Sequence, residues 1–278
     1  MRWTPKSALV TASVMLGLGC GEDGGSPPDA APDPPDGSTD ASFDAVLGDA
    51  SGDVTEDVSG GDGSRDAGSE ELVWATDVVA APGATGAGFL DERRAVDGVR
   101  GGGDSLGSTN VYSIREGRFL VLGFPGDPIG DGPGTDLVVF ENPFVIGAGP
   151  NRFMDPTIVE VSADGVDFVA FPHDFLAADE TAYSSRPEDW VSFAGVEPVR
   201  YHVEDNPVDP FSPDAGGDPF DLADLPGAQG EELRRLGIRF IRLSAASDAT
   251  NPDTGMPFPK DNLSDGPDID GVVARRSN

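Results

Sequence analysis

The sequence contains very few cysteine, lysine and histidine residues. Cys20 is the only cysteine, Lys6 and Lys260 are the only lysines, and His173 and His202 are the only histidines. A single thiol can form neither an intramolecular disulfide nor a cysteine-rich zinc site. With so few thiols and imidazoles, any metal site in this chain has to be rich in carboxylates, and such a site suits calcium better than zinc.

Positive charge is also scarce. The chain has 18 Lys and Arg residues against 50 Asp and Glu residues, which gives a formal net charge of -32. Such a surface repels polyanions, and no run of basic residues alternates with aromatic residues. These features argue against nucleic acid as a partner.

The N-terminal segment predicts export and lipid attachment. Arg2 and Lys6 precede a short apolar run that ends at Cys20, and this run is too short for a membrane-spanning helix. Its end resembles the bacterial lipoprotein signal, in which a cysteine after a small residue is acylated. The resemblance implies that residues 1 to 20 are a signal peptide ending in the acceptor Cys20, whose acyl chains hold the protein on a lipid bilayer. Gly21 follows instead of the aspartate typical of inner-membrane retention, which favours the outer membrane.

Residues 21 to 71 are predicted to be a disordered linker. This segment consists mainly of Asp, Gly, Pro, Ser and Ala, and Arg65 is its only basic residue. It offers too little apolar surface to offset the conformational entropy lost on folding. A flexible chain of this length spans roughly 40 Å, and like charges extend it further. We therefore expect an acidic tether between the lipid anchor and the folded domain.

Residues 72 to 278 are expected to form one all-β domain. Short apolar or alternating runs are separated by clusters of Gly, Pro, Asp and Asn, as in antiparallel sheets. The expected strands are residues 72 to 79, 118 to 124, 136 to 141, 157 to 163, 166 to 171, 189 to 195, 199 to 204, 238 to 245 and 270 to 275. Only residues 228 to 236 suggest a helix. The pattern predicts a single antiparallel β-sandwich of jelly-roll type, with 118 to 124 and 136 to 141 as central strands.

Two local patterns refine this expectation. Asp164-Gly165 lies between two expected strands and predicts a hairpin with a two-residue type I′ turn. The string Asp-Gly-Pro-x-x-Asp-x-Val-Val occurs at residues 131 to 139 and again at 265 to 273. This repetition suggests that Asp136 and Asp270 occupy equivalent positions at the starts of two strands.

Several sequence blocks together suggest a family. The blocks "GRFLVLGFPGDPIGDGPGTDLVVFENPF", "VEVSADGVDFVAFP", "DAGGDPFDLADL", "IRFIRLSAASD" and "DGPDIDGVVA" resemble, in order, those of a loosely characterised family of bacterial cell-surface proteins. The resemblance covers most of residues 110 to 274. It implies a galactose-binding-type or lectin-like β-sandwich at the cell surface, often attached to lipid. It differs at residues 266 to 270, where Gly-Phe-Asp-Leu-Asp is replaced by Gly-Pro-Asp-Ile-Asp.

The enzyme hypotheses are weaker than a binding hypothesis. Residues 103 to 106 read Gly-Asp-Ser-Leu and match the nucleophile block of GDSL-type esterases, which would make Ser105 the nucleophile. The upstream segment is not the apolar strand that such a serine requires, and no histidine follows at the end of the chain. A glycoside hydrolase needs two carboxylates at a suitable separation, a condition that so acidic a sequence cannot test.

The acidic loops predict a calcium site. Calcium takes six to eight oxygen ligands, often from Asp, Glu and Asn in Gly-rich loops. Asp218, Asp221 and Asp224 recur at every third residue beside Gly216-Gly217. Asp268 and Asp270 are alternate residues of an extended chain, so their side chains project to the same side about 7 Å apart. The candidates are Asp218, Asp221, Asp224, Asp268 and Asp270, with Asp131, Asp136, Glu141 and Asn142 as a secondary set. Ordinary turn chemistry of aspartate remains the alternative.

The secondary set cannot form one site. Asp136 and Glu141 lie at the two ends of an expected strand and are separated by roughly 16 Å. A ligand at either end must therefore recruit oxygens from another loop, and the acidic stretches after Asp205 and Asp265 are the expected sources.

Aromatic residues outside clear strand cores are the candidates for contact with a ligand. Jelly-roll modules commonly bind sugars through rings on a concave face or on rim loops. We take Trp190, Tyr183 and Phe211 as these candidates. The sequence as a whole favours a surface-displayed lipoprotein with a non-catalytic binding or adhesion domain, whose partner is a glycan or a surface protein. The alternatives are a secreted carbohydrate-active hydrolase with paired carboxylates and a structural envelope protein.

Overall fold

The structure is a computed structural model that describes residues 70 to 276. The expected signal peptide, Cys20 and the linker up to residue 69 lie outside these residues. The first strand begins at Glu71, next to the expected start of the domain.

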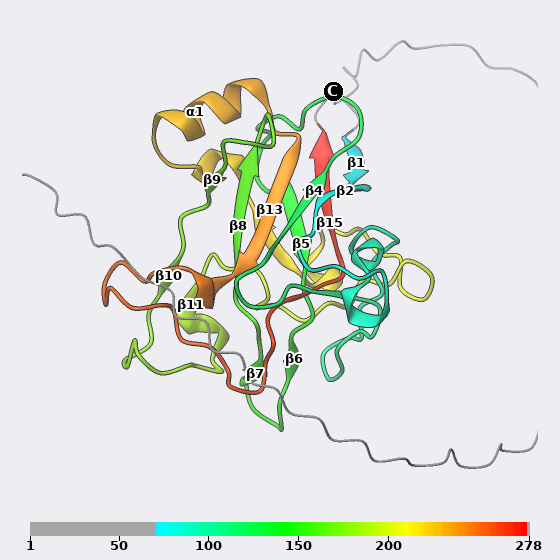
Figure 1. Cartoon of the computed structure of the whole chain (residues 1–278). Coiled ribbons are helices and arrows are strands. Elements are labelled where there is room, and N and C mark those ends of the chain that lie inside the picture. Colours follow the sequence, from blue (N-terminus) through cyan, green and yellow to red (C-terminus); the bar gives the residue numbers. More distant parts are fainter. Residues whose placement is uncertain (1–69, 277–278) are drawn as a thin grey trace, which may run out of the picture. The chain divides into compact units, whose positions relative to one another are not determined.

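Two antiparallel sheets form the domain (Figure 1). The first sheet has the order β1-β15-β5-β12, with β1 (Glu71–Trp74), β15 (Gly271–Arg276), β5 (Leu137–Phe140) and β12 (Asp218–Phe220). The second has the order β2-β4-β13-β8-β9, with β2 (Asp77–Ala80), β4 (Phe119–Gly123), β13 (Phe240–Ala245), β8 (Thr157–Ser162) and β9 (Val169–Ala170). The expected all-β antiparallel sandwich is confirmed, and its jelly-roll connectivity stays a prediction.

The remaining elements are short. Three further strand pairs join β3 (Tyr112–Ser113) to β14 (Asp268–Ile269), β6 (Phe144–Val145) to β7 (Arg152–Phe153), and β10 (Asp174–Phe175) to β11 (Trp190–Val191). The 3-10 helices are η1 (Gly88–Leu90), η2 (Glu92–Ala95), η3 (Pro187–Asp189), η4 (Pro213–Ala215), η5 (Leu222–Asp224) and η6 (Ala246–Asp248).

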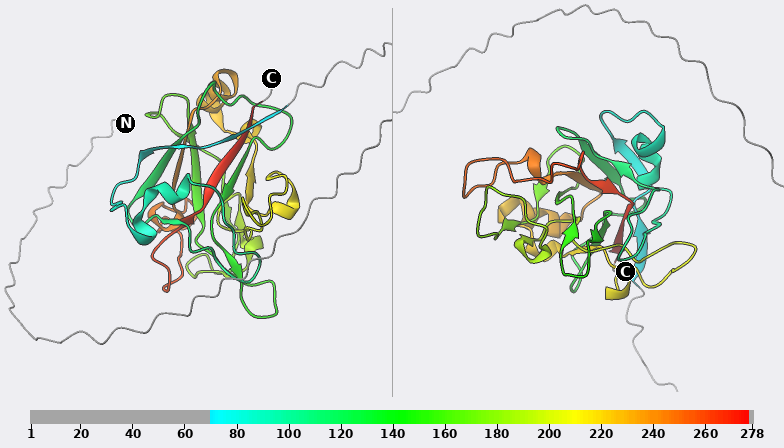
Figure 2. Two further views of the ribbon diagram at one scale, coloured as in Figure 1. Left: turned by 90° about the vertical axis from the view of Figure 1, so that its right-hand side faces the viewer. Right: turned by 90° about the horizontal axis from the view of Figure 1, so that it is seen from below.

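One α-helix occurs in the part of the chain that the structure describes. It is α1 (Gly227–Leu236), which confirms the helix expected from the sequence and ends where Gly237 adopts φ 76°. It lies at one end of the sheets, and the pairs β6–β7 and β10–β11 lie towards the other end (Figure 1 and Figure 2). Between residues 70 and 276, no helix is both long and apolar enough to cross a bilayer.

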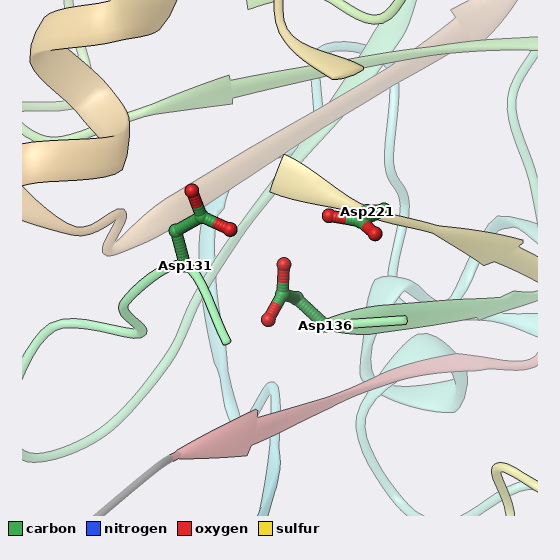
Figure 3. A group of neighbouring side chains, drawn as sticks. All are labelled: Asp131, Asp136 and Asp221. Atoms are coloured by element: carbon green, nitrogen blue, oxygen red, sulfur yellow. The ribbon is translucent and has the colours of Figure 1, made fainter. Parts of the chain in front are cut away.

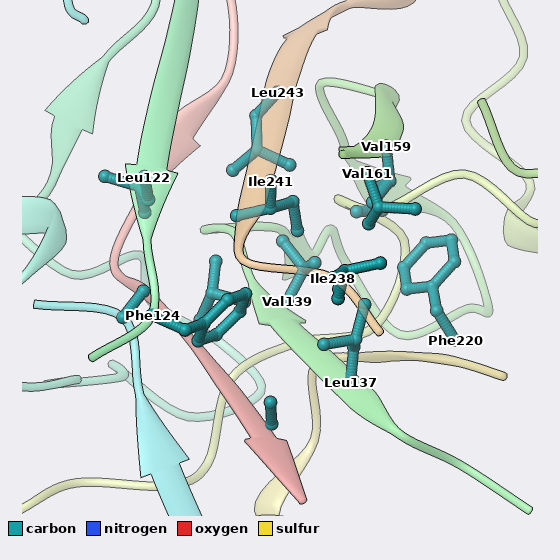
Figure 4. Packing of buried hydrophobic residues seen from close by; sticks show 14 of the residues in the cluster. Leu122, Phe124, Leu137, Val139, Val159, Val161, Phe220, Ile238, Ile241 and Leu243 are labelled. Atoms are coloured by element: carbon teal, nitrogen blue, oxygen red, sulfur yellow. The ribbon is translucent and has the colours of Figure 1, made fainter. Parts of the chain in front are cut away.

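The main hydrophobic core lies between the two sheets (Figure 4). Alternate residues of each central strand point into it, as the two-residue period of a strand requires. These residues include Leu120, Leu122, Leu137, Val139, Val159, Val161, Ile241, Leu243, Val272 and Ala274. Strand alternation thus places one apolar face of every central strand in a single core.

Strand β5 is buried on both faces. Leu137 and Val139 belong to the main core, whereas Val138 and Phe140 pack in a second cluster with Tyr201 on the other side of the sheet. Both faces of this strand are therefore apolar, as suits the central strand expected from the sequence. The charged residues Asp136 and Glu141 consequently lie at the two ends of β5, where the strand leaves the core.

Four of the expected strands are wrong in detail. The expected strands 166 to 171 and 189 to 195 contain only the two-residue strands β9 and β11. Residues 72 to 79 form two strands in different sheets, because the chain crosses between the sheets at Ala75 and Thr76, where their N–H groups donate to Val272 and Gly123. Residues 199 to 204 form no strand and make only isolated bridges. This segment covers the outer face of the first sheet. Its apolar residues alternate because they pack on that face, and the segment does not pair with a neighbouring strand along its length.

The expected hairpin between β8 and β9 forms with a longer turn. Val161 pairs with Val169, so several residues separate the paired strands. Gly165 has φ 77°, but Asp164 does not have the positive φ that a type I′ turn requires at both positions. Instead, a carboxylate oxygen of Asp164 accepts hydrogen bonds from the N–H groups of Val166 and Asp167 at 2.9 and 3.0 Å. The aspartate therefore orders the turn through its side chain.

Candidate functional site

Three carboxylates meet at the N-terminal end of β5 (Figure 3). One oxygen each from Asp131, Asp136 and Asp221 lies within 4.8 Å of the others. Asp131 and Asp136 belong to the loop that enters β5, and Asp221 follows β12. Because Phe220 pairs with Leu137, the residue after β12 faces the residue before β5. We call Asp131, Asp136 and Asp221 the entry cluster.

Backbone donors hold the central member of the entry cluster in place. The two carboxylate oxygens of Asp136 accept N–H bonds from Gly132 and Leu222, both at 2.8 Å. Burial raises the pKa of Asp136 to about 6, and the charges of Asp221 and Asp131 add to the increase while the two N–H donors oppose it. Among the described residues, no ion pair involves these three aspartates. The entry cluster thus concentrates negative charge without a neighbouring basic side chain.

A second group of acids lies at the other end of β5. Glu141 accepts an N–H bond from Asp268 at 2.8 Å through Oε1, while its buried Oε2 has no hydrogen-bond partner among the described residues. The charges of Asp155 and Asp268 both act on Glu141, which is only 2% exposed. We call Glu141, Asp155 and Asp268 the exit cluster. Each end of β5 therefore gathers acids from other loops. Asp221 and Asp268 belong to the acidic stretches that the sequence indicated, whereas Asp155 does not.

Burial raises the pKa values throughout the exit cluster. It raises the pKa of Glu141 well above its ordinary value, and the Asp155 charge raises it further. Burial likewise raises the pKa of Asp155 to about 7, against a hydrogen bond from Ser264. The pKa of Asp268 is also raised by burial, against a hydrogen bond from Ser113. A proton held by these groups at neutral pH would lower their mutual repulsion.

The exit cluster predicts a loss of stability as the pH rises. A buried acid with a raised pKa binds more protons in the folded chain than in the unfolded chain, where the ordinary Glu value is 4.5. The stability present below that value is therefore lost as the pH rises through the folded pKa, by about 1.4 kcal/mol per pH unit for each such group. We expect Glu141→Gln to reduce the fall in the free energy of unfolding between about pH 5 and pH 8.

Urea unfolding in the presence of a chelator measures this effect. Glu231, on the exposed face of α1, provides the matched control, and Glu231→Gln should leave the pH dependence as in the unmodified chain. An equal pH dependence for Glu141→Gln and the unmodified chain would show that Glu141 does not titrate in this range.

Two other predicted metal ligands are engaged by backbone N–H groups. Asp218 is buried, and its carboxylate accepts bonds from three successive residues, Gly195, Val196 and Glu197, at 2.8, 3.1 and 3.1 Å. Burial raises the pKa of Asp218 to about 7, and these donors oppose the increase. Both oxygens of Asp270 accept the N–H of Arg100, at 2.9 and 3.0 Å. These contacts give Asp218 and Asp270 roles in fixing loops.

The remaining expected ligands are also separated. Asp224 is exposed on η5 and does not join Asp218 or Asp221 in a cluster. Asp268 accepts a bond from the Ser113 hydroxyl, whereas Asp270 contacts Arg100, so the two do not share their partners. The Asn142 amide exchanges two hydrogen bonds with the backbone of Ser108.

The echo between residues 131 to 139 and 265 to 273 has a structural counterpart. Asp136 directly precedes β5, and Asp270 directly precedes β15. The two strands pair antiparallel, so the aspartates lie at opposite ends of the same ladder. The Asp270 N–H donates to Phe140, and the Asp136 carbonyl accepts from Arg275. Asp136 and Asp270 thus occupy equivalent positions, as expected.

The expected ligand-binding aromatics belong to packed clusters. Trp190 is 2% exposed, and its Nε1 donates to the Ser184 carbonyl at 2.8 Å. The Tyr183 hydroxyl donates to the Met154 carbonyl at 2.9 Å, and the Phe211 ring lies 4.1 Å from the Arg275 guanidinium carbon. Because Trp190 is held in the interior, its ring is not available to stack on a sugar, whereas Tyr183 and Phe211 are half-buried. Ser105 lies in an exposed bend with no strand before it.

Sequence reasoning missed Asp155 and a cavity beside Trp74 and Tyr201. Asp155 shares a signal with Asp136 and Asp270, because all three stand just before a strand, and this pattern could have identified it. Trp74 and Tyr201 lie in segments that the sequence predicts to be strands, and nothing in the local sequence indicates that the two residues share a cavity. A comparison of the chain with protein-family models, with curated proteins and with solved structures finds no match.

Proposed function

We propose that the chain is a surface-displayed lipoprotein whose β-sandwich is a non-catalytic binding or adhesion module stabilised by calcium. Acylated Cys20 would anchor it to the outer membrane, and the acidic linker would hold the domain away from the bilayer. Membership in the loosely characterised cell-surface family belongs to the same proposal. The observation that supports it best is the entry cluster, in which three carboxylates converge without a basic partner.

The donor set of the entry cluster suits a hard cation. Calcium prefers carboxylate and carbonyl oxygens and accepts irregular coordination that includes water. Asp131, Asp136 and Asp221 would hold the ion, and its charge would offset the repulsion that helps to raise the pKa of Asp136. In this role the ion would join the loop before β5 to the loop after β12. Calcium would thus stabilise one end of the first sheet.

Calcium is expected to raise the melting temperature of the chain. An ion that binds only the folded state stabilises it by about 2.7 kcal/mol at one hundred times its Kd. For a domain of this size, that corresponds to roughly 5 to 11 °C. Differential scanning fluorimetry of the purified chain, after chelation and across a calcium titration, measures the shift. No shift at millimolar calcium would contradict the proposed ion.

A pair of loop variants locates the ion. Asp131 is an exposed member of the entry cluster, so Asp131→Asn should weaken the calcium response and leave the fold intact. Asp127 is an exposed aspartate of the same loop outside the cluster, so Asp127→Asn should respond to calcium as the unmodified chain does. Equal calcium responses from the two variants would place the ion elsewhere.

The hydrolase alternative has less support. Glu141 and Asp155 are the most closely associated acids of the exit cluster, but Glu141 is 2% exposed, and the cavity beside Asp155 has a volume of only about 20 Å³. A glycosidase needs carboxylates that flank a sugar. Glycan-array binding followed by turnover assays on each hit separates the two functions, because a binding module releases its ligand unchanged. A structural envelope protein would bind none of the glycans.

A further inference from the structure

A cavity of about 220 Å³ opens beside the first sheet. Its walls come from β1, from the turn before β15 and from segments around Val99 and Val203. The volume is below the roughly 300 Å³ at which pockets for drug-sized ligands begin. The cavity therefore suits a small group, and neither the entry cluster nor the exit cluster contributes to it.

Two aromatic rings form part of the wall. Trp74 and Tyr201 have ring centroids 5.4 Å apart at an interplanar angle of 38°. Each ring also stacks on Phe140, with centroid distances of 6.1 and 5.8 Å, so both are held in fixed positions. The faces of such rings carry partial negative charge and attract cations.

Among the residues that the structure describes, Asp270 is the only charged one that lines this cavity. Its two oxygens accept one N–H group, that of Arg100, and burial raises its pKa to about 7. The Arg100 guanidinium does not line the cavity and instead pairs with Asp97 at 3.0 Å and Glu204 at 3.7 Å. Asp97 and Glu204 thus pair with the guanidinium, whereas Asp270 contacts only the backbone N–H of Arg100, which leaves its charge for a cationic ligand.

The wall favours an organic cation over a sugar. A sugar brings several hydroxyl groups that need hydrogen-bond partners when buried. Apart from Asp270, the lining residues are Trp, Tyr, Ala, Val and Gly, which offer few side-chain partners. A cation with an apolar surface can contact the aromatic and aliphatic walls and place its charge near a carboxylate.

We propose that this cavity binds the trimethylammonium group of a small ligand, with Trp74 and Tyr201 contacting its methyl groups and Asp270 offsetting its charge. The inference names a ligand class for the proposed binding module and rests on that function. It requires no calcium at the entry cluster.

Isothermal titration calorimetry tests the ligand on the full chain carrying Cys20→Ser, which removes the lipid acceptor. The probes are choline, tetramethylammonium and the neutral carbon analogue of choline, in which a tert-butyl group replaces the trimethylammonium group. Choline and tetramethylammonium should bind, and the neutral analogue should bind about tenfold more weakly or not at all. Equal affinities for choline and its analogue, or no binding of choline, would overturn the proposal.

Variants test the walls. Trp74→Leu and Tyr201→Leu should each lower choline affinity about tenfold. Phe168→Leu is the matched control, because this aromatic residue lies outside the cavity against Arg242. Asp270→Asn should weaken choline more than the neutral analogue. If that variant does not fold, the comparison of choline with its neutral analogue, on the chain without a wall substitution, still tests whether the positive charge of the ligand contributes to binding.

A vesicle arm distinguishes the sources of the ligand. Co-flotation of the Cys20→Ser chain with phosphatidylcholine vesicles, but not with phosphatidylglycerol vesicles, would identify a lipid headgroup. Binding of free choline without co-flotation would identify a soluble ligand. A chain that calcium stabilises but that does not discriminate choline from its analogue would retain the proposed function and refute this ligand.

Discussion

Replacement of Asp218 by alanine is expected to lower the free energy of unfolding by about 3 to 5 kcal/mol. The carboxylate accepts the N–H groups of Gly195, Val196 and Glu197, and these three donors have no other acceptor between residues 70 and 276. Alanine would leave them unpaired where Asp218 is buried, and each such donor costs about 1 to 3 kcal/mol. The loss is large because one side chain serves three successive peptide groups.

Chemical denaturation of Asp218→Ala and Asp218→Asn measures this contribution. The asparagine side chain keeps the shape and one acceptor oxygen, but its NH₂ group faces at least one N–H donor. We expect Asp218→Asn to lie between the unmodified chain and Asp218→Ala. Asp224→Ala is the control, because Asp224 is exposed and should change stability by less than about 0.5 kcal/mol. A small loss for Asp218→Ala would mean that water replaces the carboxylate.

Gly216→Ala should destabilise the fold as strongly or prevent folding. Gly216 has φ 69°, and a Cβ atom at this position would lie 1.8 Å from the Pro198 carbonyl oxygen. The left-handed conformation alone costs an L-residue about 1 to 2 kcal/mol. The contact with Pro198 adds a backbone clash that only movement of the bridge between Val199 and Gly216 could relieve. We expect a loss of more than about 4 kcal/mol in total.

Gly134→Ala separates these two effects. Gly134 has φ 82°, but no heavy atom of the described residues lies within 4 Å of the position that a Cβ atom would take, so this variant carries the conformational cost alone. We expect a loss of about 1 to 2 kcal/mol for Gly134→Ala in the same urea titration. Similar losses for the two glycine variants would show that the Pro198 loop moves aside at little cost.

The sequence predicted the fold class because its strongest signals are local. Strands β4, β5, β8, β13 and β15 coincide with apolar runs bounded by Gly, Pro and Asp, and α1 coincides with the one helical pattern. Residues 72 to 79 look like one strand, but tertiary packing divides them between two sheets. Residues 199 to 204 have the composition of a strand and cover a sheet face instead. Local pattern alone cannot distinguish these uses.

The candidate site was predictable at the level of segments. Strand length separated Asp136 from Glu141, and each of these acids has one partner, Asp221 or Asp268, in the acidic stretches that the sequence indicated. The individual partners were not predictable, because the register of β12 against β5 selects Asp221 over Asp218 and Asp224. Asp218 instead accepts hydrogen bonds from three backbone N–H groups of another loop, which the sequence around Asp218 does not indicate.

The pairing of β1 with β15 constrains when the domain can fold. Glu71, at the start of the first strand, pairs with Arg276, at the end of the last described strand, and β15 separates β1 from β5. Because a chain is synthesised from its N-terminus, β1 emerges long before its partner β15. The first sheet can close only after synthesis is nearly complete, and until then its strand edges remain open to other chains. Loss of residues 271 to 276 during or after synthesis would leave the edges of β1 and β5 permanently unpaired. The first sheet is therefore complete only when the final strand is in place.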